Sequence, residues 1–386
     1  MFKRPEILMT PGPTPVPAFV LAAQAEPLVY HRGPGYAALL DEVVEGAQWL
    51  LQTTADIIVY TSSGSGGMEG AVANLVSAGD KVLVVSVGFF GERFKTMLTR
   101  FGCEVTSIDY EWGNTTKADD VVAALDKDPE IKFVFCQHSE TSTGVVNDVE
   151  PIARAVREKD KIFILDAISS IGAVDIKMDD WGIDVCIGGS QKALGATPGI
   201  AFCAVGPRAW EAHKTSTAPR YYFDWTAYQE AYERPNSESP WTPAISVLAG
   251  MAAALRVAKE EGREAIMERH VLLARAVKAG AQALGLPLMG EDPERAVVVT
   301  AVKNPPGLTD TQIVGALRKD YGIVVAPGQG PMKGKVFRIG HLGWFMPVDV
   351  LQFFGALELV LDKLGYDFTP GSSVAAAEAI FKEAGQ

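Results

Sequence analysis

Two residues of opposite charge follow two apolar runs near the middle of the chain. Asp166 ends the run Ile-Phe-Ile-Leu-Asp, and Lys192 stands in the glycine-rich turn Gly-Gly-Ser-Gln-Lys, which follows the second run, Val185–Ile187. If the two runs are adjacent strands, a carboxylate and an amine stand at neighbouring strand ends. An amine in apolar surroundings loses proton affinity and can become a nucleophile. A carboxylate buried beside it needs a cationic partner.

One cofactor uses both groups. Pyridoxal phosphate (PLP) takes a lysine Schiff base and an acidic partner for its pyridinium nitrogen. The sequence therefore predicts a PLP site around Lys192 and Asp166. The alternative is structural: Asp166 merely ends a strand and Lys192 lies in a solvated loop, since both residue types are common in those positions.

A glycine-rich segment, Ser63-Gly-Ser-Gly-Gly67, lies between an expected strand (56–60) and an expected helix (68–77). Its backbone amides and the Ser65 hydroxyl would face an anion at the helix N-terminus. A dinucleotide fingerprint needs a third glycine where Glu69 stands, and the Gly-Lys-Ser/Thr ending of a P-loop is missing. The segment therefore suits a lone phosphate better than a dinucleotide, with a tight turn that binds nothing as the alternative.

Other side chains could complete such a site. Phe90 begins a helix at a strand end and could lie against a flat heterocycle, or it could be core. The polar run 137–144 could hold a phenolate oxygen, or it could be a capped loop. Arg338 lies in the apolar run Val-Phe-Arg-Ile-Gly, where a substrate carboxylate or a structural salt bridge would pair with it. His138 has no companion at metal-ligand spacing, so we expect no metal site.

Strand-like and helix-like segments alternate from residue 56 to residue 205. Strands separated by ten- to fifteen-residue helices imply right-handed crossovers and a mostly parallel sheet of the α/β class. Ligands of such sheets lie beyond the carboxyl ends of the strands. Ser65, Thr141, Asp166 and Lys192 all follow predicted strands, so we expect them to converge.

The chain divides into four parts on this interpretation. Residues 1–20 are proline-rich and predict an extended arm without helix. Residues 21–245 form a large domain, 246–284 form linking helices broken near Gly262, and 285–386 form a smaller α+β domain. The aromatic-rich segment 214–242 is expected to be irregular and to lie over the site or against a partner subunit.

Composition limits the possible function classes. The chain has 386 residues, 48% of them hydrophobic, and a net charge of −12. This charge argues against nucleic-acid or anionic-membrane partners. The four cysteines are scattered through apolar runs and predict reduced core thiols. No apolar run approaches the ~20 residues of a membrane helix, and no signal peptide is evident, so we expect a cytoplasmic protein.

Four motifs carry a resemblance to a known family: Ser-Gly-Ser-Gly (63–66), Glu-Thr-Ser-Thr-Gly-Val (140–145), Leu-Asp-Ala-Ile-Ser-Ser (165–170) and Gly-Ser-Gln-Lys-Ala-Leu (189–194). Together they resemble the class V (fold-type I) PLP-dependent aminotransferases, most closely the alanine/serine–glyoxylate aminotransferase group, over nearly the whole chain. The resemblance implies a large PLP-binding domain, a small C-terminal domain and a homodimer with shared active sites.

The same resemblance implies an activity. An amino group would pass from alanine or serine to glyoxylate or pyruvate by a ping-pong mechanism. Transamination of 2-aminoethylphosphonate or ureidoglycine, and more distantly cysteine desulfuration, are alternatives on this scaffold. Outside the family, a non-catalytic binding module on a degenerate scaffold is disfavoured by the presence of both Asp166 and Lys192. A nicotinamide enzyme is disfavoured by Glu69.

Residue roles also follow from the resemblance. Lys192 would form the Schiff base, Asp166 would pair with the pyridine nitrogen, and Thr141 would approach the phenolic oxygen. The phosphate would be held by Ser65, Gly66, Gly67 and Gln191, and by Thr242 contributed from the partner subunit.

Three further positions concern the ring and the substrate. Phe90 stands where relatives often have a stacking tryptophan, and Ser239 stands where some members have a tyrosine. Arg338 would take the substrate carboxylate, with Gly12 nearby. The amino donor is not fixed by the sequence, and roles for Arg32, Arg220 and Arg234 are not assigned.

Overall fold

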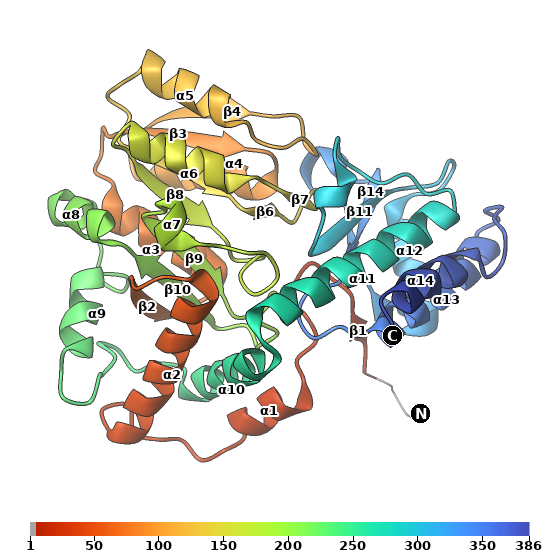
Figure 1. Ribbon diagram of the computed structural model, residues 1–386, viewed down its shortest axis with the longest axis horizontal. Helices are drawn as coiled ribbons and strands as arrows, with labels where there is room; N and C mark the ends of the chain where they lie inside the picture. The colour runs from red at the N-terminus through yellow and green to blue at the C-terminus, as the bar shows by residue number, and fades with distance from the viewer. Residues whose placement is uncertain (1–4, 386) are drawn as a thin grey trace.

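A seven-stranded sheet is the centre of the computed structural model, which describes residues 5–385 (Figure 1). The strand order is β2-β10-β9-β8-β5-β3-β4, and only β10 runs antiparallel to its neighbours. The predicted α/β class with a mostly parallel sheet is therefore confirmed. The strands are β2 (Asp56–Thr61), β3 (Lys81–Ser86), β4 (Glu104–Asp109), β5 (Phe133–Gln137), β8 (Ile162–Asp166), β9 (Val185–Gly189) and β10 (Ile200–Val205).

Helices cover both faces of this sheet. Ile57 and Val59 pack toward one layer, and Ile58 and Tyr60 toward the other. Burial on both faces explains why these strands, apart from the edge strand β4, read as continuous apolar runs. The first layer holds α2 (Pro34–Leu51), α5 (Ala118–Lys127), α6 (Val149–Glu158) and α10 (Ile245–Glu261); the second holds α3 (Gly64–Leu75), α4 (Phe89–Arg100), α8 (Pro207–Thr215) and α9 (Trp225–Tyr232).

The C-terminal part of the chain builds a second body with its own core, in which Phe337, Phe353, Phe354 and Phe381 are buried. Its sheet has the order β11-β14-β13. The domain boundaries given above remain a prediction. The elements are α11 (Arg263–Ala283), β11 (Val299–Lys303), α12 (Asp310–Ala316), a π turn (Leu317–Tyr321), β12 (Ile323–Val324), β13 (Ala326–Pro327), β14 (Val336–Gly340), α13 (Pro347–Lys363) and α14 (Ser372–Glu383).

The N-terminal arm connects the two bodies. Its strand β1 (Ile7–Leu8) pairs in parallel with β12. Further along, the Gly340 amide donates to Met9 O at 2.8 Å, and the Thr14 amide donates to Gln191 O at 3.2 Å. The arm is shorter than predicted, because helix α1 (Ala18–Gln24) begins directly after Pro17, where the proline run ends.

Two other segments differ from the sequence-based expectation. Helix α3 begins at Gly64 rather than near residue 68, so the glycine run forms its first turn. The segment 214–242 is not irregular throughout, because α9 buries Trp225, Tyr228 and Ala231 at helical spacing. Elements that were not predicted are α7 (Met178–Trp181), α8, the hairpin β6–β7 (Ser139–Glu140 and Val145–Val146) and short 3-10 turns (Pro293–Arg295 and Gly330–Met332).

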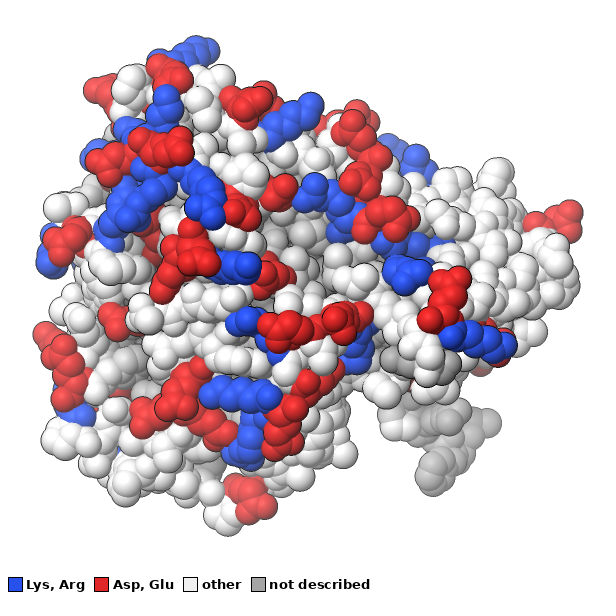
Figure 2. Space-filling view, in the orientation of Figure 1, with Lys and Arg blue, Asp and Glu red and all other residues white. Residues whose placement is uncertain are grey.

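The charged surface and the buried cysteines agree with what the composition of the chain predicts. Acidic and basic side chains are interspersed on the face shown in Figure 2. All four cysteines are free and buried, as expected. Within residues 5–385, no helix combines the length and the apolar character needed to cross a bilayer.

Candidate active site

The predicted site residues meet at the carboxyl edge of the large sheet. β8 ends at Asp166, and its neighbour β9 ends three residues before Lys192, with Asp166 opposite Ile187 in the register. On the other side, Gln137 of β5 lies opposite Asp166, and the chain continues into Thr141. The expected convergence at this edge is confirmed, because parallel neighbours end on the same side.

Lys192 lies against the N-terminal arm. Its Nζ donates to Pro11 O at 2.6 Å. A Cβ atom added at Gly12 would lie 2.6 Å from that Nζ, and the φ of Gly12 is +140°, so only glycine fits here. Burial lowers the pKa of Lys192 to about 8; Asp166 opposes this shift, and the charges of Arg338 and Arg93 add to it. The amine therefore loses its proton more readily than an ordinary lysine.

Asp166 is only 6% exposed. Among the described residues, its carboxylate accepts one hydrogen bond, from the Ile168 amide at 3.0 Å. Burial raises the pKa of Asp166 to about 6; the Ile168 bond opposes this shift and the charge of Glu140 adds to it. A buried carboxylate with so little compensation suits a cationic ring nitrogen.

Glu140 organises the site although its carboxylate was not predicted to take part. It is fully buried and accepts hydrogen bonds from the Phe90 amide (2.9 Å), the Ser142 amide (3.0 Å) and the Ser142 hydroxyl (2.7 Å). A Cβ atom on Gly88 would lie 2.4 Å from Glu140 Cγ. Burial raises the pKa of Glu140. Glu140 thus fixes the start of α4, and with it Phe90.

Arg338 reaches the site from β14 of the second body and is 5% exposed. Its Nη1 donates to Thr141 O at 2.9 Å, and its Nε donates to Pro327 O at 3.1 Å. Burial lowers the pKa of Arg338 to about 10. Among the described residues no carboxylate forms an ion pair with Arg338, so the alternative of a structural salt bridge is wrong for that part of the chain. Its Nη2 has no hydrogen-bond partner among them, which leaves one edge of the guanidinium available for an anion.

Ser65 lies in the first turn of α3, where its hydroxyl accepts a hydrogen bond from Arg93 Nη1 at 2.6 Å. The amides of Gly66 and Gly67 donate to Ser63 O at 2.8 and 3.4 Å. A Cβ atom on Gly67 would lie 2.9 Å from Ile187 Cγ2, so this glycine lets α3 pack closely on β9. Arg93 was not among the residues predicted for the site.

Three other residues predicted for the site differ from one another in how far they are buried. The Gln191 Oε1 is buried and lacks a hydrogen-bond partner among the described residues. Phe90 is half-buried, with the Arg93 guanidinium carbon 4.5 Å from its ring centroid. Thr242 is exposed on the single chain, and Ser239 is buried.

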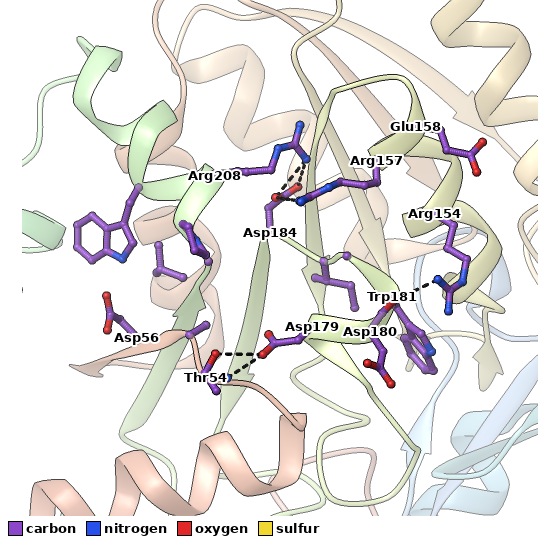
Figure 3. Close-up of a pocket in the computed structure, with 17 residues that line it drawn as sticks. Thr54, Asp56, Arg154, Arg157, Glu158, Asp179, Asp180, Trp181, Asp184 and Arg208 are labelled. Carbon is purple, nitrogen blue, oxygen red and sulfur yellow. Dashed lines mark hydrogen bonds and ion pairs between the residues drawn. The ribbon is translucent and has the colours of Figure 1, made fainter.

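A separate cavity of about 710 Å³ lies at the opposite, amino-terminal edge of the sheet (Figure 3). There Asp184 pairs with Arg157 at 3.5 Å and Arg208 at 3.3 Å, and Asp179 accepts a hydrogen bond from the Thr54 amide at 2.9 Å. None of the predicted site residues lines this cavity. In the part of the chain that the structure describes, no cluster of three His, Cys, Asp or Glu side chains could hold a metal ion.

The sheet topology and the lysine–aspartate pair at its carboxyl edge define the fold-type I aminotransferase architecture. The family model for class V aminotransferases matches residues 19–338. The chain therefore belongs to the class V aminotransferase family, whose cofactor is PLP. The site residues fit this group: Asp166 has a largely uncompensated carboxylate, Lys192 has a lowered pKa, and Ser65 lies at a helix N-terminus.

Individual proteins are similar over nearly the full length. A soluble hydrogenase small subunit of Synechococcus sp. is 40% identical over 98% of this chain and 99% of its own. An L-aspartate–glyoxylate aminotransferase of Paracoccus denitrificans is 35% identical over 97% of this chain and 96% of its own. The crystal structure of ureidoglycine–glyoxylate aminotransferase from Bacillus subtilis superimposes with a TM-score of 0.94, at 30% identity and with 99% of both chains covered.

Proposed function

We propose that this protein transfers an amino group from a small amino acid, alanine or serine, to a small 2-oxo acid, glyoxylate or pyruvate. The observation that carries the proposal is the juxtaposition of Lys192 and Asp166 at adjacent strand ends, with the unpaired guanidinium of Arg338 beside Thr141. Two of the relatives described above have glyoxylate in their names, which supports glyoxylate as the acceptor. The choice of alanine or serine rests on the sequence motifs.

Each site residue has a role in this proposal. PLP, when bound, supplies an electron-withdrawing ring that makes the substrate Cα proton acidic. Lys192 would take this proton from Cα as general base and deliver it to C4′ of the cofactor as general acid. Asp166 holds the proton on the ring nitrogen, because an opposite charge nearby favours the charged form. Thr141 approaches the phenolic oxygen and Phe90 lies against the ring.

Substrate binding is assigned to the second body and the arm. The guanidinium of Arg338 binds the substrate carboxylate, since a fork of N–H donors matches a planar anion. Gly12 leaves room beside Lys192. The same residues serve both half-reactions, with the amino group held by the enzyme between them, so we expect ping-pong kinetics.

The phosphate of the cofactor is assigned to Ser65, Gly66, Gly67 and Gln191, with Thr242 from the partner subunit of a homodimer. Exposed apolar side chains support such an assembly, because isolated chains seldom expose them in groups. Leu28 is 70% exposed and Tyr30 65%, and Tyr221 is 76% exposed and contacts Trp241 with ring centroids 4.7 Å apart and the rings tilted by 34°.

Cysteine desulfuration is disfavoured by the thiols themselves. Burial raises the pKa of Cys103 to about 11 and the pKa of Cys136 to about 12. Burial also raises the pKa of Cys203 to about 12 and holds the pKa of Cys186 well above its ordinary range. A desulfurase needs an accessible thiolate, and these buried thiols stay protonated at neutral pH.

A donor–acceptor matrix tests the proposal. Purified protein is loaded with PLP, and alanine, serine, aspartate, cysteine, 2-aminoethylphosphonate and ureidoglycine are each offered with glyoxylate or pyruvate. We expect the fastest turnover with alanine or serine and glyoxylate, and parallel double-reciprocal lines. Faster turnover with ureidoglycine or 2-aminoethylphosphonate would replace the donor assignment.

The lysine assignment has its own test. Borohydride reduction should leave PLP attached to Lys192, located by mass spectrometry of peptides. Lys192→Ala should lose this label and all turnover, whereas the exposed-lysine control Lys382→Ala should retain both. An active Lys192→Ala enzyme would contradict the proposal.

A further inference from the structure

Arg93 lies at the active-site edge but has no role in the assignments above. It stands in the second turn of α4, whose start is fixed by the Glu140 carboxylate. Its guanidinium carbon lies 4.5 Å from the centroid of the Phe90 ring, and its Nη1 donates to the Ser65 hydroxyl at 2.6 Å. The side chain is therefore held between α4 and the first turn of α3.

Arg93 has no carboxylate within 4.0 Å among the described residues, which is rare for an arginine of this chain. Of the arginines that the structure describes, all but Arg93, Arg100 and Arg338 have a carboxylate within 4.0 Å. Arg100 is exposed at the end of α4, where water solvates it. Of the three, Arg93 is half-buried and Arg338 is buried, and Arg338 is already assigned to the substrate carboxylate.

The guanidinium of Arg93 is only partly satisfied. Within the described residues its one hydrogen bond is to Ser65, so Nε and Nη2 have no partner. Removing a cation from water without an anionic partner costs free energy. The position of Arg93 therefore indicates an anion that the protein itself does not supply.

We propose that Arg93 binds the phosphate group of the cofactor together with Ser65, an inference that rests on the proposed function. Ser65 lies in the first turn of a twelve-residue helix, whose N-terminus favours an anion. The guanidinium adds a full positive charge and a planar fork of donors. The contact with Phe90 holds the side chain in place before the ligand arrives.

The charges of the whole site agree with this role. Three cationic side chains, Lys192, Arg93 and Arg338, interact with two buried acids, Asp166 and Glu140. A phosphate near Arg93 and a substrate carboxylate near Arg338 would each meet a cation of their own.

The test compares PLP with pyridoxal, which has the same ring without the phosphate. Cofactor-free wild type, Arg93→Gln, Arg93→Lys and the control Arg100→Gln are titrated with each compound, and binding is followed by absorbance. We expect Arg93→Gln to raise the Kd of PLP by roughly 10- to 100-fold, the range for a charge-assisted hydrogen bond. The Kd of pyridoxal should change less than twofold, Arg93→Lys should recover part of the loss, and Arg100→Gln should match wild type.

A second measurement uses inorganic phosphate and does not require the pyridine ring of the cofactor to bind. Inorganic phosphate should raise the unfolding temperature of the cofactor-free wild type and of Arg100→Gln, and should do so much less for Arg93→Gln. The absolute unfolding temperatures show whether the variant is folded, and an unfolded Arg93→Gln leaves Arg93→Lys to carry the comparison.

Several results would overturn the inference. An equal loss of PLP and pyridoxal affinity would mean that Arg93 supports the fold or the ring. An unchanged Kd for PLP would remove Arg93 from the phosphate site, and a selective loss of aspartate turnover at unchanged Kd would move it to the substrate. Wild-type protein that binds neither compound would instead refute the proposed function, and this inference with it.

Discussion

Arg338 illustrates at the residue scale how a missing partner points to a ligand. Its guanidinium is buried, donates only to the carbonyls of Thr141 and Pro327, and forms no ion pair among the described residues, although the charge of Glu140 acts on it. Arg338→Gln should therefore raise the KM for the oxo acid by roughly 10- to 100-fold, since charged hydrogen bonds contribute roughly 1.5–3 kcal/mol. Steady-state kinetics over a range of glyoxylate concentrations measure this, with the exposed Arg100→Gln as a surface control.

An unchanged KM for Arg338→Gln would return this arginine to a purely structural role. The unfolding temperature must be recorded in parallel, because Arg338 also ties β14 to the Thr141 segment. A lower unfolding temperature at unchanged KM would show that the hydrogen bonds to Thr141 and Pro327 are its whole function.

The raised pKa of Asp166 predicts how the free energy of unfolding depends on pH. Burial raises its pKa from an ordinary 3.8 to about 6. Between these values the unfolded chain has lost a proton that the folded chain keeps, so the free energy of unfolding falls as the pH rises from about 4 to about 6. For cofactor-free protein this fall amounts to at most about 3 kcal/mol.

Urea denaturation of cofactor-free wild type and Asp166→Asn at several pH values isolates this contribution, because all other groups cancel in the difference. The stability of wild type relative to Asp166→Asn should decline through the window from pH 4 to 6. A difference that stays constant with pH would contradict the raised pKa.

Some of these site residues could be predicted from the sequence and others could not. Asp166, Lys192 and Arg338 stand out because each is a charge at the end of or within an apolar run. Glu140 and Arg93 do not, since their roles depend on contacts between distant segments, such as Phe90 with Glu140, 50 positions apart. No local pattern encodes such a contact.

At the scale of elements, the position of α4 depends on one close approach. A Cβ atom on Gly88 would lie 2.4 Å from the Glu140 side chain. Gly88→Ala should destabilise the protein by roughly 1–3 kcal/mol through overpacking and weaken PLP binding, because Phe90 and Arg93 move with the helix. Denaturant unfolding and PLP titration measure the two effects.

The matched control is Gly355→Ala in the middle of α13, where an added Cβ meets nothing within 4 Å. Alanine should stabilise that helix by up to about 1 kcal/mol. Equal effects of the two substitutions would show that the contact between Gly88 and Glu140 carries no strain.

Helices and strands were predicted correctly where burial gives the sequence a clear hydrophobic pattern. Apart from the edge strand β4, whose residues are exposed or half-buried, the strands of the large sheet are mostly buried and read as apolar runs, so their existence followed from the sequence. Helix α9 was missed because its aromatic residues lie among prolines and polar residues, although Trp225, Tyr228 and Ala231 keep helical spacing. Helix α1 was missed because the preceding prolines dominated the composition of the arm.

At the scale of the molecule, the proposed homodimer should depend on the exposed apolar side chains. Leu28 lines a groove of about 360 Å³ between α2, α10 and the segment after α1. Leu28→Asp should yield a monomer with weaker PLP binding, since Thr242 of the partner is then absent. Sedimentation velocity and PLP titration test this.

Leu359→Asp is the control for the dimer prediction, because Leu359 is 56% exposed on α13 of the other body. It should leave both the mass of the particle and the affinity for PLP unchanged. A dimeric Leu28→Asp protein would place the subunit contact elsewhere, and a monomeric wild type would refute the dimer.

The N-terminal arm also determines when the active site can be completed during translation. Ile7 is translated long before its strand partner Ile323, which lies more than 300 residues further along the chain. Pro11 and Gly12, which contact the Lys192 amine, lie just beyond this strand. The large sheet can form while the nascent chain is still growing, but the catalytic centre can be completed only after β12 and β14 have been translated. A product truncated before β12 would carry the lysine without a finished site.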